Sequence, residues 1–156
     1  MEDWIWMPHA GHLCIGSMCK FHLNTYVNGY IVSTVGEYFP DQECRRIYLE
    51  ARRKYPILDI LTGEKVTDEE TINKVLKLQG DDFDYAYLHY FGYLEIGSNR
   101  LYETMVFEAQ KSESKCCPYE MKKDGDDLDM EGYNTAEKAF LGHYARCKKW
   151  DKKNKV

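Results

Sequence analysis

The stretch NTYVNGYIVSTV, residues 24–35, decides the fold. Two runs rich in β-branched and aromatic residues flank Asn28-Gly29, a dipeptide that favours the two-residue type I′ turn of a β-hairpin. We therefore expect an antiparallel hairpin over residues 20–37. Pairing outward from the turn joins Val27 to Tyr30, Thr25 to Val32, Leu23 to Thr34 and Phe21 to Gly36 on a mostly apolar face, and Tyr26 to Ile31, Asn24 to Ser33, His22 to Val35 and Lys20 to Glu37 on the other. The last of these pairs predicts a cross-strand ion pair.

The rest of the chain predicts an α+β fold, with a small antiparallel sheet and helices packed mainly on one face. Helices are expected at 41–55, 66–79, 81–91 and 133–150, and two further strands at 93–109 around a turn at 97–99. Residues 110–132 are polar and acidic, which is typical of a loop. The chain is treated as one domain, 1–156, with 52–80 as a possible insertion and 151–156 as a frayed basic tail.

Capping residues set the expected helix ends. Asp41 is the expected N-cap of the first helix, which ends before Pro56, and a capping box of Thr67 and Glu70 begins the second, which Gly80 ends. Asp81 or Asp82 is expected to cap the third helix, which Gly92 ends, and Asn134 or Thr135 to cap the last. Helical spacing predicts buried stripes over Cys44, Ile47, Tyr48 and Ala51 in the first helix and over Ala136, Phe140, His143, Cys147 and Trp150 in the last.

Composition indicates a globular protein without nucleic acid as its main partner. The formal net charge is -5 at pH 7, whereas a general nucleic-acid binder presents a basic face. No apolar run approaches the length of a membrane span, and the first residues do not form a signal peptide, so a cytoplasmic location is expected. Six cysteines in that compartment are expected to be thiols or metal ligands.

Five segments carry a resemblance to a known family: MPHAGHLC, CKFHLNTYVNGYIVSTVGEY, GYLEIGSNRLYETMVFEA, CCPYE and GYNTAEKAFLGHYARCKKW. They resemble a family of small uncharacterised proteins encoded by bacteriophages and prophages. The likeness covers most of residues 7–150, with 52–80 the least typical part. It implies a phage accessory protein that works in the cytoplasm of the host cell, with a host or phage protein as partner, and it implies no particular chemistry.

The segment MPHAGHLCIGSMCKFH, residues 7–22, is unusually dense in histidine and cysteine. Imidazole nitrogens and thiolates are the ligands that zinc prefers in tetrahedral sites, although the spacing here fits no standard zinc finger. We predict one zinc-like site that uses His9, His12 and Cys19, with a fourth ligand from Cys14 or from the distant Cys116-Cys117 pair. The alternative is that these side chains only pack and hydrogen-bond.

Two further residues are candidates for catalysis. Strand alternation places Glu103 among apolar residues, where a carboxyl group acquires a raised pKa suited to acid–base chemistry, and His143 lies on the inward stripe of the last helix. The structural alternative for Glu103 is an ion pair with Arg100 or a lysine on an edge strand, and this alternative is favoured because structural ion pairs are commoner than catalytic ones.

Two classes of function follow. The first is a metal-stabilised phage protein that binds or inhibits a host macromolecule, such as a defence system. The second is a small metal-dependent hydrolase or transferase in which His9, His12, Glu103 and His143 converge on a pocket. A closed four-ligand metal site favours the first class, and three ligands with an open position favour the second.

Overall fold

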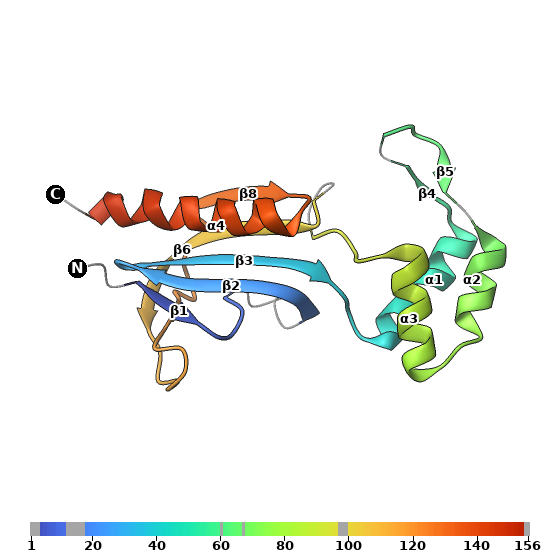
Figure 1. Ribbon diagram of the computed structural model, residues 1–156, viewed down its shortest axis with the longest axis horizontal. Helices are drawn as coiled ribbons and strands as arrows, with labels where there is room; N and C mark the ends of the chain where they lie inside the picture. Colours follow the sequence, from blue (N-terminus) through green and yellow to red (C-terminus); the bar gives the residue numbers. More distant parts are fainter. Residues whose placement is uncertain (1–3, 12–17, 60, 67, 97–99, 155–156) are drawn as a thin grey trace. The chain divides into compact units, whose positions relative to one another are not determined.

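Figure 1 shows the computed structural model, which describes residues 4–11, 18–59, 61–66, 68–96 and 100–154. The chain divides into two compact units, one made of residues 1–39 and 94–156 and the other of residues 40–93. The second unit thus interrupts the first in sequence and contains the 52–80 stretch. Helices and an antiparallel sheet together confirm the predicted α+β class.

The first unit is built on a six-stranded antiparallel sheet with the order β1-β2-β3-β6-β7, in which β8 also pairs with β6. Its strands are β1 (Ile5–Met7), β2 (Cys19–Val27), β3 (Tyr30–Tyr38), β6 (Tyr102–Lys111), β7 (Tyr119–Met121) and β8 (Asp129–Tyr133). β6 holds the sheet together, because β3 pairs with one of its edges while β8 and β7 pair in turn along the other.

The β2–β3 hairpin forms with the predicted register from Phe21–Gly36 inward to Val27–Tyr30. Asn28 and Gly29 have φ values of 45° and 97°, the positive values that a two-residue hairpin turn requires. At the outer end of the hairpin, the contacts of Lys20 and Glu37 differ from the predicted ion pair. Glu37 has a φ of 56° and accepts a hydrogen bond of 2.8 Å from the Tyr102 hydroxyl, and the Lys20 ammonium lies 4.8 Å from the centre of the Phe39 ring.

Helix α4 (Ala136–Asp151) lies along one face of this sheet, as Figure 1 shows, and Thr135 is its N-cap. The predicted stripe is only partly right. The buried residues follow a four-residue spacing, Ala139, His143, Cys147 and Asp151, while Ala136 and Phe140 are exposed. Asp151, expected in the frayed tail, ends the helix buried and accepts a hydrogen bond from the Asn28 amide, so the hairpin turn is tied to the end of α4. A short 3-10 turn, Lys152–Asn154, follows.

The opposite face of the sheet is covered by the sheet's own curl. Met7, Ile31 and Phe107 form a buried cluster there, against which residues of β7 pack. The Tyr119 ring of β7 stacks on Tyr26, with 3.7 Å between ring centres and planes 11° apart. β7 is therefore folded back towards β1 and β2 and is not a simple extension of the sheet.

Residues 110–132 were expected as loop but contain β7 and β8, so this prediction is wrong. The strands are short and partly exposed, and their polar composition hides them from pattern analysis. Tertiary contacts hold β8: the Asp129 carboxylate accepts hydrogen bonds from Lys149 (2.8 Å) and from the Trp150 indole (3.0 Å). The expected strand at 93–96 is reduced to a single bridge between Tyr38 and Leu94, and residues 97–99 lie outside the described part.

The second unit contains α1 (Gln42–Lys54), a small hairpin of β4 (Ile57–Leu58) and β5 (Lys65–Val66), α2 (Glu69–Leu76) and α3 (Gly80–Phe91). The Asp41 cap and the Gly92 stop are confirmed. Three other predicted ends are wrong. Asp68 caps α2, which ends at Leu76 and not at Gly80, and α3 begins after Gln79. Thr67 lies outside the described residues.

The stripe predicted for α1 is also wrong, because Arg45 and Leu49 are its buried residues while Cys44, Ile47 and Ala51 are exposed. Arg45 can be buried because its head group is paired with both an anion and a carbonyl. It donates to Asp84 at 2.6 Å and to the Pro40 carbonyl at 2.7 Å, and it lies over the rings of Phe83 and Tyr87. A guanidinium that is paired and lies against aromatic faces is compatible with burial. A pattern built on apolar residues alone does not predict a buried arginine.

The turn gives the first testable prediction. Gly29→Val is expected to lower the free energy of unfolding by about 1–3 kcal/mol, because a β-branched residue is strained at a φ of 97°. Gly125→Val is the matched control, since a Cβ there meets its nearest neighbours at 3.5 Å, an ordinary contact distance. Urea unfolding of both variants measures the difference, and equal midpoints would contradict the assigned turn.

Candidate metal centre

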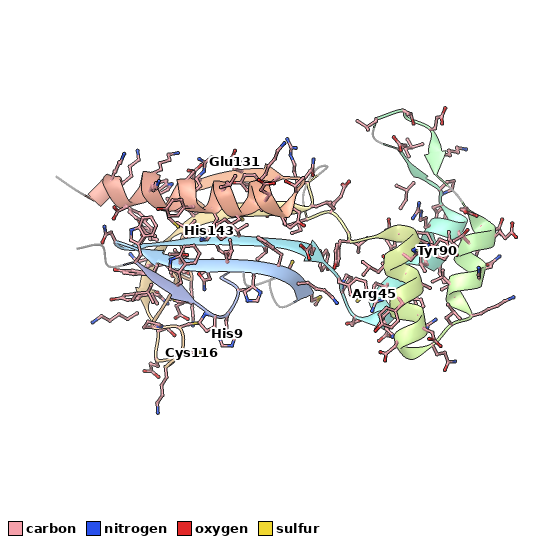
Figure 2. The ribbon with its side chains drawn as sticks, viewed as in Figure 1. His9, Arg45, Tyr90, Cys116, Glu131 and His143 are labelled. Atoms are coloured by element: carbon pink, nitrogen blue, oxygen red, sulfur yellow. The ribbon has the colours of Figure 1, made fainter. Side chains whose placement is uncertain are left out.

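The structure brings together His9, Cys116 and Cys117, as Figure 2 shows for His9 and Cys116. The ligand atoms of these three residues all lie within 4.8 Å of one another. Nδ1 of His9 lies 3.4 Å from each of the two cysteine sulfurs. His9 and Cys116 are exposed and Cys117 is half-buried, so an ion could reach the cluster from solvent.

Backbone contacts place His9. It follows β1, and the Asn24 amide of β2 donates a hydrogen bond of 2.9 Å to the His9 carbonyl. One residue earlier, the Pro8 carbonyl lies 2.8 Å from Nε2 of His22. The segment after β1 is thus attached to β2 by two side chains, and this leaves the imidazole of His9 directed at the cysteines.

The cysteines lie in the connection between β6 and β7, which two serines shape. The Ser112 backbone N–H donates to the Pro118 carbonyl at 2.9 Å and closes the loop, while the Ser112 hydroxyl accepts from the Ser114 N–H at 3.2 Å. The Ser114 hydroxyl lies 3.2 Å from the Cys116 sulfur and accepts from the Cys117 N–H at 3.4 Å. Both sulfurs are therefore presented from a turn with its own hydrogen bonds.

The two thiols differ in electrostatic environment. The hydrogen bond from the Ser114 hydroxyl lowers the pKa of Cys116, since it stabilises the thiolate. Partial burial raises the pKa of Cys117. A thiolate is the form that binds metal, so Cys116 is the better prepared of the two ligands.

A pocket of about 300 Å³ adjoins the cluster. It is lined by the three candidate ligands together with residues from the segment after β1, the sheet and β7, among them Asn24, Ile31, Tyr119 and Glu120. One nitrogen and two sulfurs suit zinc, and a fourth ligand would complete a tetrahedron on the side that the three residues leave open. The geometry therefore supports a three-ligand metal-binding group at the mouth of a pocket.

Cys19 is not part of this cluster, although the sequence analysis included it. It is buried at the start of β2 opposite Tyr38, and burial raises its pKa to about 11. Five residues of strand separate it from Asn24, which is roughly 17 Å at about 3.3 Å per residue. His12 and Cys14, the other predicted ligands, lie outside the described residues.

The two catalytic candidates do not converge. Thr104, next to Glu103 in β6, bonds to Thr34 on the face that α4 covers, so alternation directs Glu103 to the opposite face. Burial, and secondarily the charge of Asp127, raises the pKa of Glu103. The expected edge-strand position is also wrong, since β6 runs between β3 and β8 and Glu103 pairs with Val35 on one side and Gly132 on the other.

His143 is fully buried and both of its ring nitrogens are in use. Nε2 lies 2.8 Å from the Thr25 hydroxyl and Nδ1 lies 2.7 Å from the Thr34 hydroxyl, which in turn bonds to Thr104 at 2.5 Å. Burial lowers the pKa of the imidazole to about 4, so it is neutral at pH 7. His143 and the buried Cys147 face inward as predicted, and the hydrogen bonds give His143 a structural role between helix and sheet.

Sequence reasoning named the cysteine pair only as one option for a fourth ligand, and it missed Ser112 and Ser114. The signal that could have found them is the SxSKCC pattern, in which two hydroxyls precede adjacent thiols in a polar segment. The reason His9 meets this segment is the fold-back of β7, which no local pattern shows.

Comparisons with protein-family models, with curated proteins and with solved structures found no match. Among the described residues, none of the helices has both the length and the apolar character needed to cross a membrane.

Burial of His143 gives the second prediction. Its pKa is about 4 in the folded protein against 6.5 for an ordinary histidine, so between these values the unfolded chain binds a proton that the folded chain does not. The free energy of unfolding is therefore expected to fall as the pH drops from 6.5 to 4, by roughly 3 kcal/mol from this group.

Urea unfolding across this pH range, compared between the wild type and His143→Gln, isolates the contribution. The exposed His89→Gln is the matched control and should keep the wild-type slope. If the His143 variant does not fold, NMR titration of the wild type decides: an imidazole of His143 that protonates near pH 6.5 would show that the burial argument is wrong.

Proposed function

We propose that this chain is a zinc-binding phage accessory protein that acts by binding, and so inhibiting, a host macromolecule. The observation that carries the metal part is the His9, Cys116 and Cys117 group, whose ligand atoms lie within 4.8 Å of one another. The phage part rests on the sequence resemblance, which covers most of residues 7–150. A host protein, for instance of a defence system, is the proposed target.

In this proposal the ion fastens two segments that are 107 positions apart in the sequence. The ligands come from the segment after β1 and from the β6–β7 connection, which meet only in the folded chain. Binding to the native state alone adds the binding free energy to the stability of the fold. The ion would thereby hold the β7 fold-back and the surface around it in one conformation, as a binding surface requires.

A second candidate, a small zinc-dependent hydrolase or transferase, is favoured by the pocket of about 300 Å³ beside the group. An ion held by three protein ligands keeps a position for water or substrate, and that position would face the pocket. Glu120 lines the pocket and accepts a hydrogen bond of 2.9 Å from Gln110, so a carboxylate is at hand for proton transfer. Glu103 and His143 have no part in this version.

The third prediction tests metal binding. Tag-free protein titrated with Co²⁺ as a spectroscopic substitute for zinc is expected to show thiolate-to-metal absorption at one equivalent, and zinc should displace it. Cys116→Ser, Cys117→Ser and His9→Ala should each weaken zinc binding by at least tenfold, since each removes one of three ligands. Chelator should lower the melting temperature of the zinc-loaded wild type but not of these variants.

Cys44→Ser is the matched control, because Cys44 is an exposed thiol in α1, outside the group. It should bind metal as the wild type does. Melting that is insensitive to chelator, or cobalt absorption that survives loss of both Cys116 and Cys117, would refute the metal site.

The coordination number separates the two candidates. X-ray absorption at the zinc edge is expected to show four nitrogen and sulfur ligands if the ion is structural, and three with one oxygen if the site is open. An open site together with zinc-dependent hydrolysis of chromogenic ester or phosphate substrates, lost in Cys116→Ser and kept in Cys44→Ser, would establish the enzyme instead.

A further inference from the structure

The outer surface of α4 carries a row of solvent-exposed residues. Glu137, Leu141, Tyr144 and Lys148 follow the spacing i, i+4, i+7, i+11, which places them along one side of a helix. All four are exposed, and the two in the middle are large and apolar, with 58% of Leu141 and 42% of Tyr144 exposed. We call this row the outer stripe.

The outer stripe is distinct from the buried residues of the same helix. Ala139, His143, Cys147 and Asp151 face the sheet, while the outer stripe lies on average about a third of a turn away. Phe140 extends the apolar surface on one flank and is 51% exposed. Tyr144 is held in place from both sides, by the Trp4 ring at 5.8 Å and by the Lys148 ammonium at 4.4 Å from its ring centre. Clustered exposed apolar side chains of this kind mark interaction surfaces.

The order of residues in the outer stripe makes it complementary to itself. If two copies of α4 lie antiparallel about a two-fold axis between Leu141 and Tyr144, Leu141 faces Tyr144 of the second copy. Glu137 then faces Lys148 of the second copy, and the axis repeats each pair. A parallel arrangement would instead set Glu137 beside Glu137 and Lys148 beside Lys148, which like-charge repulsion disfavours.

We propose that the protein forms a homodimer in which the outer stripes of two α4 helices pack antiparallel. Two apolar pairs lie at the centre and an ion pair closes each end, which is the isologous pattern of a two-fold interface. The 16-residue helix is about 24 Å long, enough to include both ion pairs in one contact. The outer stripe has a negative charge at one end and a positive charge at the other, so a second, reversed copy brings opposite charges together at both ends. This match favours a second copy of the chain over an unrelated partner.

The first experiment measures mass in solution. Light scattering after gel filtration, over a range of protein concentrations, is expected to give twice the 18.4 kDa mass of the chain. Leu141→Arg should return it to the mass of one chain, because a charge then sits at the centre of the contact. Since Leu141 is largely exposed in one chain, circular dichroism and the far-ultraviolet melting curve should show that the variant remains folded.

Charge exchange tests the antiparallel geometry itself. Lys148→Glu and Glu137→Lys should each raise the dimer dissociation constant by about tenfold, since each turns two attractive pairs into repulsive ones. The double variant, Glu137→Lys with Lys148→Glu, should restore the wild-type constant. Lys111→Glu makes the same charge change at an exposed position of β6, away from α4, and should have no effect.

Three results would overturn the proposal. They are a wild type that stays at the mass of one chain at the highest concentration tested, association that Leu141→Arg leaves unchanged, or single charge variants that weaken the dimer without rescue in the double variant. None of these results depends on zinc, since the ligands of the proposed metal site lie outside α4.

Discussion

The first unit depends on one buried contact, in which the His143 ring lies between two threonine hydroxyls of the sheet. Thr25 on β2 and Thr34 on β3 are at hydrogen-bond distance from its two nitrogens, so a single side chain of α4 joins both strands of the hairpin. Loss of the ring would leave buried hydroxyls without that partner, at a cost of about 1–3 kcal/mol for each unsatisfied group. Because the bonds have a direction, they also fix which residues of α4 face the sheet, which apolar contacts alone would leave less defined.

This position of α4 has consequences at its C-terminal end, along one flank and on its outer surface. At its C-terminal end Asp151 meets Asn28 in the hairpin turn, and along one flank Lys149 and Trp150 hold Asp129 of β8. With the inward side of α4 facing the sheet, Leu141 and Tyr144 are left largely exposed on the surface. The exposed apolar pair is therefore a consequence of the same rotation of the helix that buries His143, and it would lie at the centre of the proposed two-fold contact.

The candidate metal centre depends on the other face of the sheet. There β7 turns back over Tyr26 and carries Cys116 and Cys117 to the segment that follows β1. The stacked rings of Tyr26 and Tyr119 and the cluster around Ile31 provide the apolar contact for this turn. The thiols and the imidazole line the pocket, so an ion held there would also act on the shape of the pocket. This linkage is why the proposed ion would stabilise the fold and shape its surface at once.

The sequence by itself determined the elements whose signals are local. The Asn28-Gly29 turn fixed the hairpin and its register almost to its ends, and Asp41 and Gly92 fixed two helix ends, because a turn or cap is satisfied by neighbours in sequence. Only the tertiary structure decided what lies between distant segments. The polar strands β7 and β8 form because β6 supplies their hydrogen-bond partners, and Arg45 is buried because Asp84 and two aromatic rings receive it. For the candidate site, the sequence named His9, but it joined His9 first to His12 and Cys19 and gave the Cys116-Cys117 pair only as an option for the fourth ligand. Distance along the chain says little about distance in space once a sheet curls, and the curl of this sheet brings Cys116 and Cys117 close to His9.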